Sequence, residues 1–218
     1  MLAHKIPYQK FSYADYIEWS DKERWEIIDG IAYDMSPSPG MRHQEISFRL
    51  SGIFYRLLKN SRCRAFTAPF DVIFIEDSDL KDNAFEADNV EYNNIQLTRL
   101  KNHSVEYSEI KTVVQPDIVV VCDPEKLQQR GCFGSPDIVV EILSKATAYK
   151  DETEKLRLYE KYAVKEYWII NPDAEYIMRY LFDKDSSKYA KPEYLIKEDI
   201  LESIAVKGLA VDLMELWA

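Results

Sequence analysis

Two short apolar runs near the middle of the chain carry carboxylates where a buried strand would otherwise be apolar. The first run is Ile118–Val121, preceded by Asp117, and the second is Ile138–Leu143, with Glu141 inside it. Short β-branched runs of this kind are typical of buried strands. A carboxylate in such surroundings is costly unless hydrogen bonds or a cation compensate its charge. The two runs therefore predict a site with a chemical role as well as a core.

The carboxylates of Asp117 and Glu141 are the candidate metal ligands. Strand side chains alternate between the two faces of a sheet, so the two carboxylates approach each other if the runs pair in matching register. Carboxylates at short distance repel, and one would hold a proton unless a cation lay between them. Mg²⁺ prefers oxygen ligands and keeps several waters, and Mn²⁺ suits the same ligands. We expect Asp117 and Glu141 to bind Mg²⁺, with Mn²⁺ as a substitute, and so to activate water against a phosphodiester.

Two basic side chains complete the candidate catalytic set. Lys155 falls on a helix expected after the second run, where its ammonium group could orient the water or stabilise developing negative charge. His43 stands at the start of an earlier helix and could assist at the phosphate. Each has a simpler interpretation, because Lys155 could pair with Asp151 on its own helix and His43 could be a capping group. Asp117 and Asp137 each follow a proline and could instead bond to backbone amides at a strand start, and we expect this of Asp137.

Local signals place the elements before the two runs. A short helix is expected within residues 8–20, with Ser12 as its N-cap. Asp29-Gly30 between two apolar runs predicts a β-hairpin, because glycine accepts positive φ at no steric cost. Apolar residues at helical spacing predict a helix from Arg42 to Lys59.

The remaining pattern predicts a single α/β domain over residues 1–218. Strands are expected at 66–75, 113–121, 137–143, 166–171, 175–182, 194–197 and 203–206, with turns over 122–135. A helix over 151–163 should begin in a capping box at Asp151. Residues 76–111 are too long for an ordinary connection and are interpreted as a surface excursion.

Charge and cysteine content limit the partners and the setting. The net charge of −10 counts against general nucleic-acid binding, which depends on positive charge. A basic run over 42–64 is either a local binding face or a solvated helix face. No apolar run approaches the roughly 20 residues of a membrane span, and the N-terminus shows no signal-peptide pattern. Three cysteines without CxxC spacing favour a reduced, cytoplasmic setting, with Cys122 as a small core residue.

The chain resembles a known family. Asp117, followed by Glu141 on the next core strand, resembles the PD-(D/E)XK restriction-endonuclease-like superfamily. Within it, the chain is similar to the Uma-type putative endonucleases over most of its length. The resemblance is carried by Trp25–Gly30, Ser36–Pro39 with His43, Ala68–Val72, Gln115–Asp117 with Cys122–Pro124, Gly134–Ser144, Asp151 with Glu154–Leu156, and Glu166–Ile169.

The resemblance implies both a fold and an activity. The fold would be a restriction-endonuclease-like core, with a central mixed β-sheet flanked by helices, an N-terminal hairpin and C-terminal antiparallel strands. The activity would be Mg²⁺-dependent cleavage of DNA, with Asp117 and Glu141 on the metal. The superfamily motif expects a lysine two residues after the second acid, where this chain has Leu143. In the Uma-type proteins the lysine has moved to the following helix, which places its role on Lys155.

A different class of function stays open beside the nuclease. The same fold with a decayed site would be a nucleic-acid-binding or scaffold module, which the missing strand lysine and the acidic net charge favour. RNA as substrate is not separated from DNA by the sequence. Because a duplex has two strands and one site cuts one of them, a twofold homodimer is expected.

Overall fold

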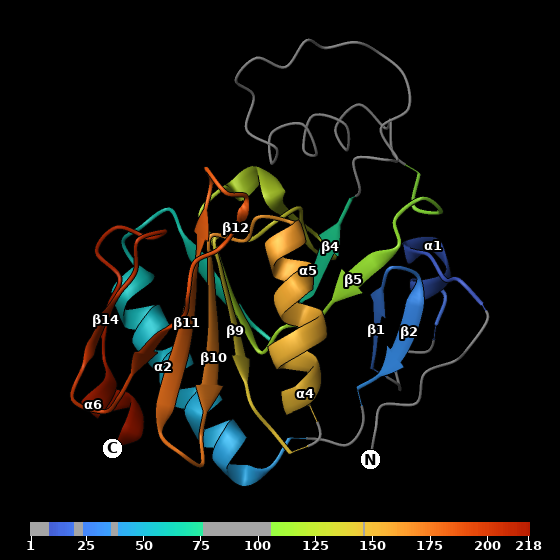
Figure 1. The fold of residues 1–218 in the computed structure, drawn as a ribbon. Helices are drawn as coiled ribbons and strands as arrows, with labels where there is room; N and C mark the ends of the chain where they lie inside the picture. Colours follow the sequence, from blue (N-terminus) through green and yellow to red (C-terminus); the bar gives the residue numbers. More distant parts are fainter. Residues whose placement is uncertain (1–8, 20–23, 36–38, 76–105, 146) are drawn as a thin grey trace. The chain divides into compact units, whose positions relative to one another are not determined.

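The computed structural model of this protein describes residues 9–19, 24–35, 39–75, 106–145 and 147–218 (Figure 1). The chain divides into two compact units. The first unit comprises Met1–Pro37, Asp71–Gln115 and Glu125–Ser135, and the second comprises Ser38–Phe70, Pro116–Pro124 and Pro136–Ala218. Most of the predicted surface excursion, residues 76–105, lies outside the described residues.

The first unit is built on a six-stranded sheet with the order β2-β1-β5-β4-β8-β7. Its strands are β1 (Trp25–Ile28), β2 (Ile31–Asp34), β4 (Asp71–Phe74), β5 (Thr112–Val114), β7 (Leu127–Gln128) and β8 (Gly131–Phe133). The short helix α1 (Tyr13–Tyr16) belongs to this unit. Tyr13 packs in one apolar cluster with Ile73, Val113 and Phe133, so α1 covers part of the sheet.

The local predictions for the first unit are confirmed. Asp29 and Gly30 have φ of 49° and 80°, the left-handed values that a two-residue hairpin turn requires. Ser12 caps α1 in a capping box, because its backbone N–H donates to the Asp15 carboxylate at 2.7 Å and its side chain accepts from the Asp15 N–H. Both signals act over two to four residues of chain, which is why the sequence suffices to predict them.

The second unit holds a seven-stranded sheet with the order β12-β11-β10-β9-β6-β3, in which β13 also pairs with β11. Its strands are β3 (Arg64–Thr67), β6 (Ile118–Val121), β9 (Ile138–Ile142), β10 (Glu166–Asn171), β11 (Tyr176–Asp183), β12 (Lys188–Tyr189) and β13 (Glu193–Leu195). β9 and β10 are parallel, whereas β6 with β9 and β10 with β11 are antiparallel. The predicted α/β fold with a mixed sheet and flanking helices is confirmed.

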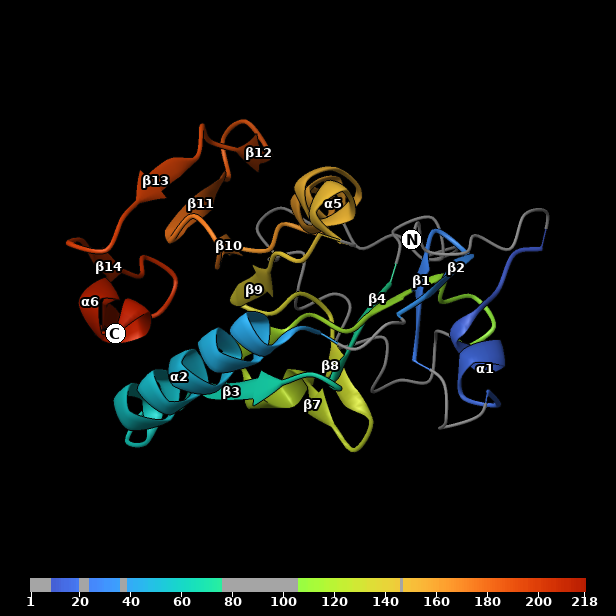
Figure 2. The ribbon, with the colours of Figure 1, turned by 90° about the horizontal axis from the view of Figure 1, so that it is seen from below.

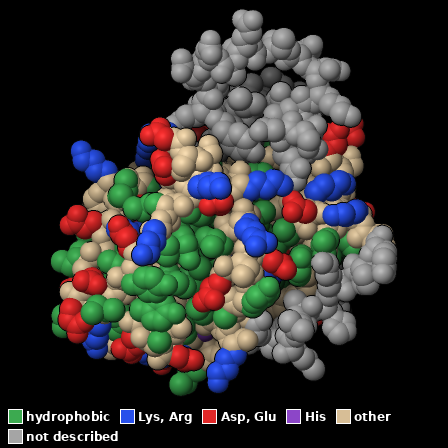
Figure 3. Space-filling view, viewed as in Figure 1, with side chains coloured by type: hydrophobic (Ala, Val, Ile, Leu, Met, Phe, Trp, Pro, Cys, Tyr) green, Lys and Arg blue, Asp and Glu red, His purple; other side chains and the backbone are tan. Residues whose placement is uncertain are grey.

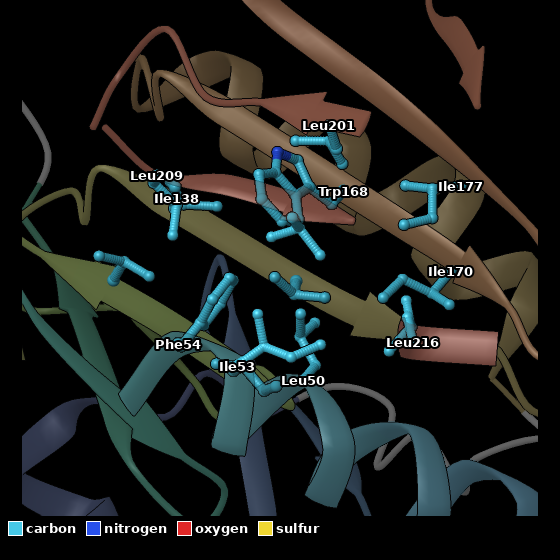
Figure 4. Packing of buried hydrophobic residues seen from close by; sticks show 14 of the residues in the cluster. Leu50, Ile53, Phe54, Ile138, Trp168, Ile170, Ile177, Leu201, Leu209 and Leu216 are labelled. Carbon is cyan, nitrogen blue, oxygen red and sulfur yellow. The ribbon is translucent and has the colours of Figure 1, made fainter. Parts of the chain in front are cut away.

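Helices lie on both faces of this second sheet. They are α2 (Met41–Leu58), α4 (Ala148–Lys150), α5 (Leu156–Lys161) and α6 (Leu213–Trp217), with a π-helical turn, η3 (Asp151–Lys155), between α4 and α5. Figure 2 shows α2 and α5 on opposite sides of β9 and β10. The apolar side of α2, predicted from its spacing, is buried on the sheet, and Figure 4 shows Leu50, Ile53 and Phe54 directed at Ile138 and Trp168. Because strand side chains alternate, the other face is left for Glu141 and α5.

Two predicted strands are wrong because each is interrupted by a proline. The segment 66–75 is divided into β3 and β4 at Pro69, and 113–121 is divided into β5 and β6 at Pro116. Proline has no N–H to donate to a strand ladder, so pairing stops there. The two pieces of each segment then join different sheets. Residues 122–135, expected as turns, also contain the 3₁₀ helix η2 (Pro124–Lys126) and the strands β7 and β8.

The predicted strand at 203–206 is wrong as well. The C-terminal hairpin is formed instead by β14 (Ile200–Glu202) and β15 (Ala210–Asp212). The backbone N–H groups of Ile204 and Ala205 donate to Glu166 Oε1 at 2.6 and 2.7 Å. Because these N–H groups donate to a carboxylate, they cannot form the backbone hydrogen bonds of a β-strand. The predicted strand at 194–197 is present as β13.

Glu166 is therefore expected to hold this hairpin on the sheet. Its carboxylate is buried and also accepts from Ser203 Oγ and from Trp168 Nε1, both at 2.8 Å. Glu166→Ala leaves four donors without a partner, so we expect the free energy of unfolding to fall by about 3 kcal/mol. Denaturation in urea measures this change. Glu166→Gln, which keeps an acceptor oxygen but sets an amide against the Trp168 N–H, should lose less, and an equal loss in both variants would contradict the account.

A disulfide joins Cys63 to Cys122 and was not expected from the sequence. Cys122 is buried at the end of β6, as predicted for a small core residue, and Cys63 lies partly buried just before β3. The two strands are antiparallel neighbours, with Arg64 opposite Val121, so the next residue outward on each strand meets its partner. The two cysteines are 59 residues apart in the sequence. Their contact could not be predicted from the sequence because it depends on the register of β3 and β6. Cys132 is buried and free.

Candidate active site

The Glu141 carboxylate lies on the sheet face opposite α2, where η3 and α5 cover it. Its Oε1 accepts hydrogen bonds from Lys155 Nζ and from the Tyr159 hydroxyl, each at 2.8 Å. Glu141 is 4% exposed and Lys155 2%, so both charges are withdrawn from water. Two charges are retained in such a place only when they compensate each other. The pairing of Lys155 with Asp151 on its own helix also exists, but at 3.8 Å.

The π-helical turn η3 directs Lys155 to the sheet. It continues α4 without interruption, so the helix begins at Ala148 and the capping box predicted at Asp151 is wrong. The Asp151 N–H instead donates to the Thr147 carbonyl oxygen at 3.0 Å, as an internal helical residue does. A π turn contains more residues than an α turn, so residues four apart lie more nearly on one side. Asp151 and Lys155 are accordingly both buried.

Asp117 stands across the sheet from Glu141. β6 and β9 pair with Ile118 opposite Val140, and continuing this antiparallel register by one residue places Asp117 opposite Glu141. The Asp117 Oδ2 accepts from the Ile142 N–H at 2.8 Å and lies 3.0 Å from His43 Nε2. Its Oδ1 accepts no hydrogen bond from the described part of the chain, and the side chain is partly exposed. The predicted register is thus present.

His43 reaches Asp117 from the first turn of α2. The side chain is buried, and its Nδ1 is a buried nitrogen without a hydrogen-bond partner among the described residues. In the neutral imidazole with Nε2 donating to Asp117, Nδ1 is an acceptor. The structure therefore brings His43 into contact with one candidate metal ligand, while Lys155 contacts the other.

Tyrosines complete the surroundings of the buried pair. Burial, and then the negative charges of Glu141 and Asp151, raise the pKa of the Tyr167 phenol well above its usual value. Tyr167 therefore keeps its proton, which it donates to the Asp151 carbonyl oxygen at 3.0 Å within the π turn. The rings of Tyr159 and Tyr167 contact each other edge to face, with centroids 4.8 Å apart.

Sequence reasoning missed both tyrosines. Tyr159 lies four residues after Lys155, a spacing that puts two side chains on one side of a helix. That spacing was the available signal for Tyr159. For Tyr167 there was none, because its role depends on the position of β10 beneath η3.

Asp137 has the structural role expected of it. Its Oδ2 accepts from the Cys122 N–H at 2.7 Å, and its Oδ1 accepts from Lys165 Nζ at 2.8 Å. These bonds fix the start of β9 against the end of β6. Asp137 is thus a buried carboxylate on the same strand as Glu141 whose partners are a backbone amide and a lysine.

The three arginines that α2 contributes to the basic run over 42–64 are engaged within the second unit. Arg42 pairs with Glu175 at 2.7 Å, Arg49 donates to the Leu216 carbonyl oxygen at 3.2 Å, and Arg56 pairs with an acid of α6. Figure 3 shows Lys and Arg side chains interspersed with Asp and Glu around α5. The arginines of α2 therefore hold the helix in place, which counts against their forming a nucleic-acid-binding face.

The donor chemistry of Asp117 and Glu141 fits a hard divalent cation. No cluster of three or more His, Cys, Asp or Glu side chains able to hold a metal occurs among the described residues. Two carboxylates are enough for Mg²⁺, which is usually held by one or two carboxylates and several waters. None of the helices described is both long and apolar enough to cross a lipid bilayer.

Comparison with known proteins identifies the family. Residues 13–214 match the Uma2 family model, described as "Putative restriction endonuclease". Among solved structures, the chain resembles a crystal structure titled as a putative nuclease belonging to DUF820 from Anabaena variabilis ATCC 29413. The TM-score is 0.65 at 15% identity, over 95% of this chain and 97% of that one, a likeness that concerns the fold alone. No curated protein gives a significant match. Because the family model spans nearly the whole chain, this protein belongs to the Uma2 family of restriction-endonuclease-like proteins.

Proposed function

We propose that this protein is a Mg²⁺-dependent endonuclease that hydrolyses DNA phosphodiester bonds. The family and the nuclease-like fold support nuclease activity. The observation that carries the proposal is the 2.8 Å contact between Lys155 Nζ and Glu141 Oε1. Through this contact, a lysine on the helix reaches the carboxylate of the strand. The superfamily motif expects a lysine on the strand itself, two residues after Glu141, where this chain has Leu143.

The candidate residues have distinct proposed roles. Asp117 and Glu141 would hold Mg²⁺, which when bound supplies Lewis-acid activation of a water and of the phosphate. Tyr159 and Lys155 orient the Glu141 carboxylate through their hydrogen bonds to it. The Lys155 ammonium group would stabilise negative charge that develops on the phosphate. His43 fixes the orientation of Asp117 through their 3.0 Å contact. Action of His43 on the phosphate stays a prediction.

Nicking of supercoiled plasmid tests the proposal. With Mg²⁺ or Mn²⁺ we expect conversion to the open-circular form, and none after chelation of the metal. A structured RNA in a parallel reaction separates the two substrates, with DNA expected to be cut. Absence of cleavage of either nucleic acid, with metal bound, would reject the enzyme.

The alternative is a nuclease-fold protein that binds nucleic acid or a partner protein without cleaving. The specific observation in its favour is at Asp117, whose Oδ2 is already engaged by His43 Nε2 and by the Ile142 N–H. The engaged arginines of α2 and the net charge of −10 point the same way. Calorimetric titration with Mn²⁺ distinguishes the two functions, since only the enzyme needs a metal that depends on both Asp117 and Glu141.

The proposal extends to the organisation of the protein. We propose that both units act as one nuclease domain, which is supported by a family match running through residues of each. We also propose a homodimer, since two sites related by a twofold axis can act on the two strands of a duplex.

A cytoplasmic setting is also part of the proposal, and it makes a prediction about the cysteines. Cellular thiols keep most protein cysteines reduced in that compartment. The structure joins Cys63 and Cys122 in a disulfide, which a cytoplasmic protein would form only after the cell is opened. We therefore expect both cysteines to react with an alkylating reagent applied at the moment of cell lysis, as read by mass spectrometry. Recovery of the two cysteines as a disulfide, resistant to the reagent until reduced, would contradict the cytoplasmic setting.

A further inference from the structure

Three large apolar side chains project from the outer side of α2. Met41, Phe48 and Tyr55 are 79%, 83% and 77% exposed. They are spaced seven residues apart, which is about two helical turns, so they form a single row along the helix. The row is on the side opposite the residues that α2 buries on the sheet. Single apolar residues scattered on a surface are ordinary, whereas large exposed apolar side chains gathered on one side of a helix are typical of a binding surface.

The residues between these three alternate with them along the same row. Glu45, Gly52 and Lys59 follow at steps of four and three residues, and we call the six together the α2 stripe. A Cβ added to Gly52 would meet no atom within 4 Å, so the middle of the stripe is open and without a side chain. Glu45 and Lys59 are each seven residues from Gly52, in opposite directions and with opposite charges.

This pattern is complementary to itself when two helices run antiparallel. A twofold axis at Gly52 places Glu45 opposite the partner's Lys59, and the reverse pair follows by symmetry. The same axis brings Phe48 beside the partner's Tyr55. Gly52 would then meet its counterpart where the helices are closest, and the absence of side chains there lets the backbones approach. A parallel arrangement would set like charges together instead.

We propose that a second copy of this chain covers the α2 stripe, with the two α2 helices packed antiparallel about a twofold axis at Gly52. The surface gives the proposed homodimer its interface, and its evidence is independent of the metal ligands. Glu45 also contacts Arg42 at 3.5 Å, but its side chain stays 43% exposed and free to turn toward a partner. The row of arginines beside the stripe is already paired within the second unit.

A rival apolar surface lies over β11 and β13, beside α5 in Figure 3. Tyr194 is 63% exposed there and packs against Tyr176, with ring centroids 5.9 Å apart. Its aromatic rings therefore cover one another in part, and Arg179 of β11 is already paired with Glu193 of β13. The α2 stripe is favoured because it has both an uncovered apolar row and a charge pattern that specifies the partner.

Light scattering of the purified full chain over a range of micromolar concentrations tests the proposal. The parent protein should be a dimer, and Phe48→Glu should weaken self-association about 30-fold or more, as the loss of a central contact residue does. Tyr194→Glu is the matched control on the rival surface and should leave the dimer intact. Circular dichroism checks that the exposed substitutions leave the fold unchanged.

Charge reversal tests the antiparallel pairing. Glu45→Lys and Lys59→Glu should each weaken the dimer, because each sets like charges opposite one another, and the double variant should restore it. A monomeric parent, a dimer unaffected by Phe48→Glu, disruption by Tyr194→Glu, or a double variant weaker than both singles would each overturn the proposal. Because these experiments measure molar mass and not cleavage, a failure of the dimer proposal can be distinguished from a failure of the nuclease proposal.

Discussion

Lys155→Met is expected to reduce metal-dependent nicking about 100-fold or more while Mn²⁺ binding persists. A group that stabilises charge only in the transition state contributes about that much to the rate. The methionine keeps an apolar chain of similar length in the buried position. Because the competing positive charge beside Glu141 is gone, Mn²⁺ should bind at least as tightly as in the parent. Single-turnover nicking and calorimetric titration measure the two effects separately.

The buried position of Lys155 adds a cost in stability. Removing one partner of a buried ion pair leaves the other charge without compensation, which lowers the free energy of unfolding by about 3 kcal/mol. Assays should therefore be run well below the melting temperature of the variant. Lys161→Met, an exposed lysine on α5, is the control and should cut like the parent. A folded Lys155→Met protein that still cuts at the parental rate would remove the lysine from the mechanism and favour the binding-module alternative.

Glu141→Gln and Asp117→Asn are expected to lose both metal binding and cleavage. Each change preserves shape but removes a negative charge, and affinity for hard cations depends on the number of charged oxygen ligands. We expect Mn²⁺ affinity to fall by about 100-fold or more in each variant. Calorimetry gives the affinity, and nicking should fall below detection in both.

Asp137→Asn is the matched control for this pair of variants. It removes a buried carboxylate from the start of the same strand as Glu141, but that carboxylate bonds to the Cys122 N–H and to Lys165. Its Mn²⁺ affinity should equal that of the parent, even if its stability is lower. If Mn²⁺ affinity fell equally in Asp137→Asn and Glu141→Gln, the loss would reflect the removal of any buried charge and not the loss of a metal ligand.

Local signals in the sequence were sufficient for several elements. The Asp29-Gly30 turn and the Ser12 cap depend on atoms within a few residues, and the apolar spacing of α2 determines which side it buries. The period-two alternation of β6 and β9 determines which of their side chains share a face of the sheet. In each case the chain itself carries the information, because the interacting groups are close in sequence or repeat with a fixed period.

Tertiary structure decided what depends on distant partners. The strands at 66–75 and 113–121 stop at prolines, and the sheet that each remaining piece joins is set by neighbours far along the chain. Residues 203–206 turn because the carboxylate of Glu166 captures their N–H groups. Local secondary-structure propensity predicts neither the choice of sheet nor the turn at 203–206, since each depends on a partner dozens of residues away.

The candidate site combines both kinds of information. The sequence by itself supplied two carboxylates on core strands, a lysine on the next helix and a histidine before them. Only the fold decided that Lys155 points inward, through a π turn whose carbonyl group is bonded by Tyr167 from β10. An α-helix starting at Asp151 would not by itself determine whether the Lys155 side chain faces the sheet or the solvent. A buried charge needs its partner within hydrogen-bond distance, and that distance is a property of the packed sheet and helix together.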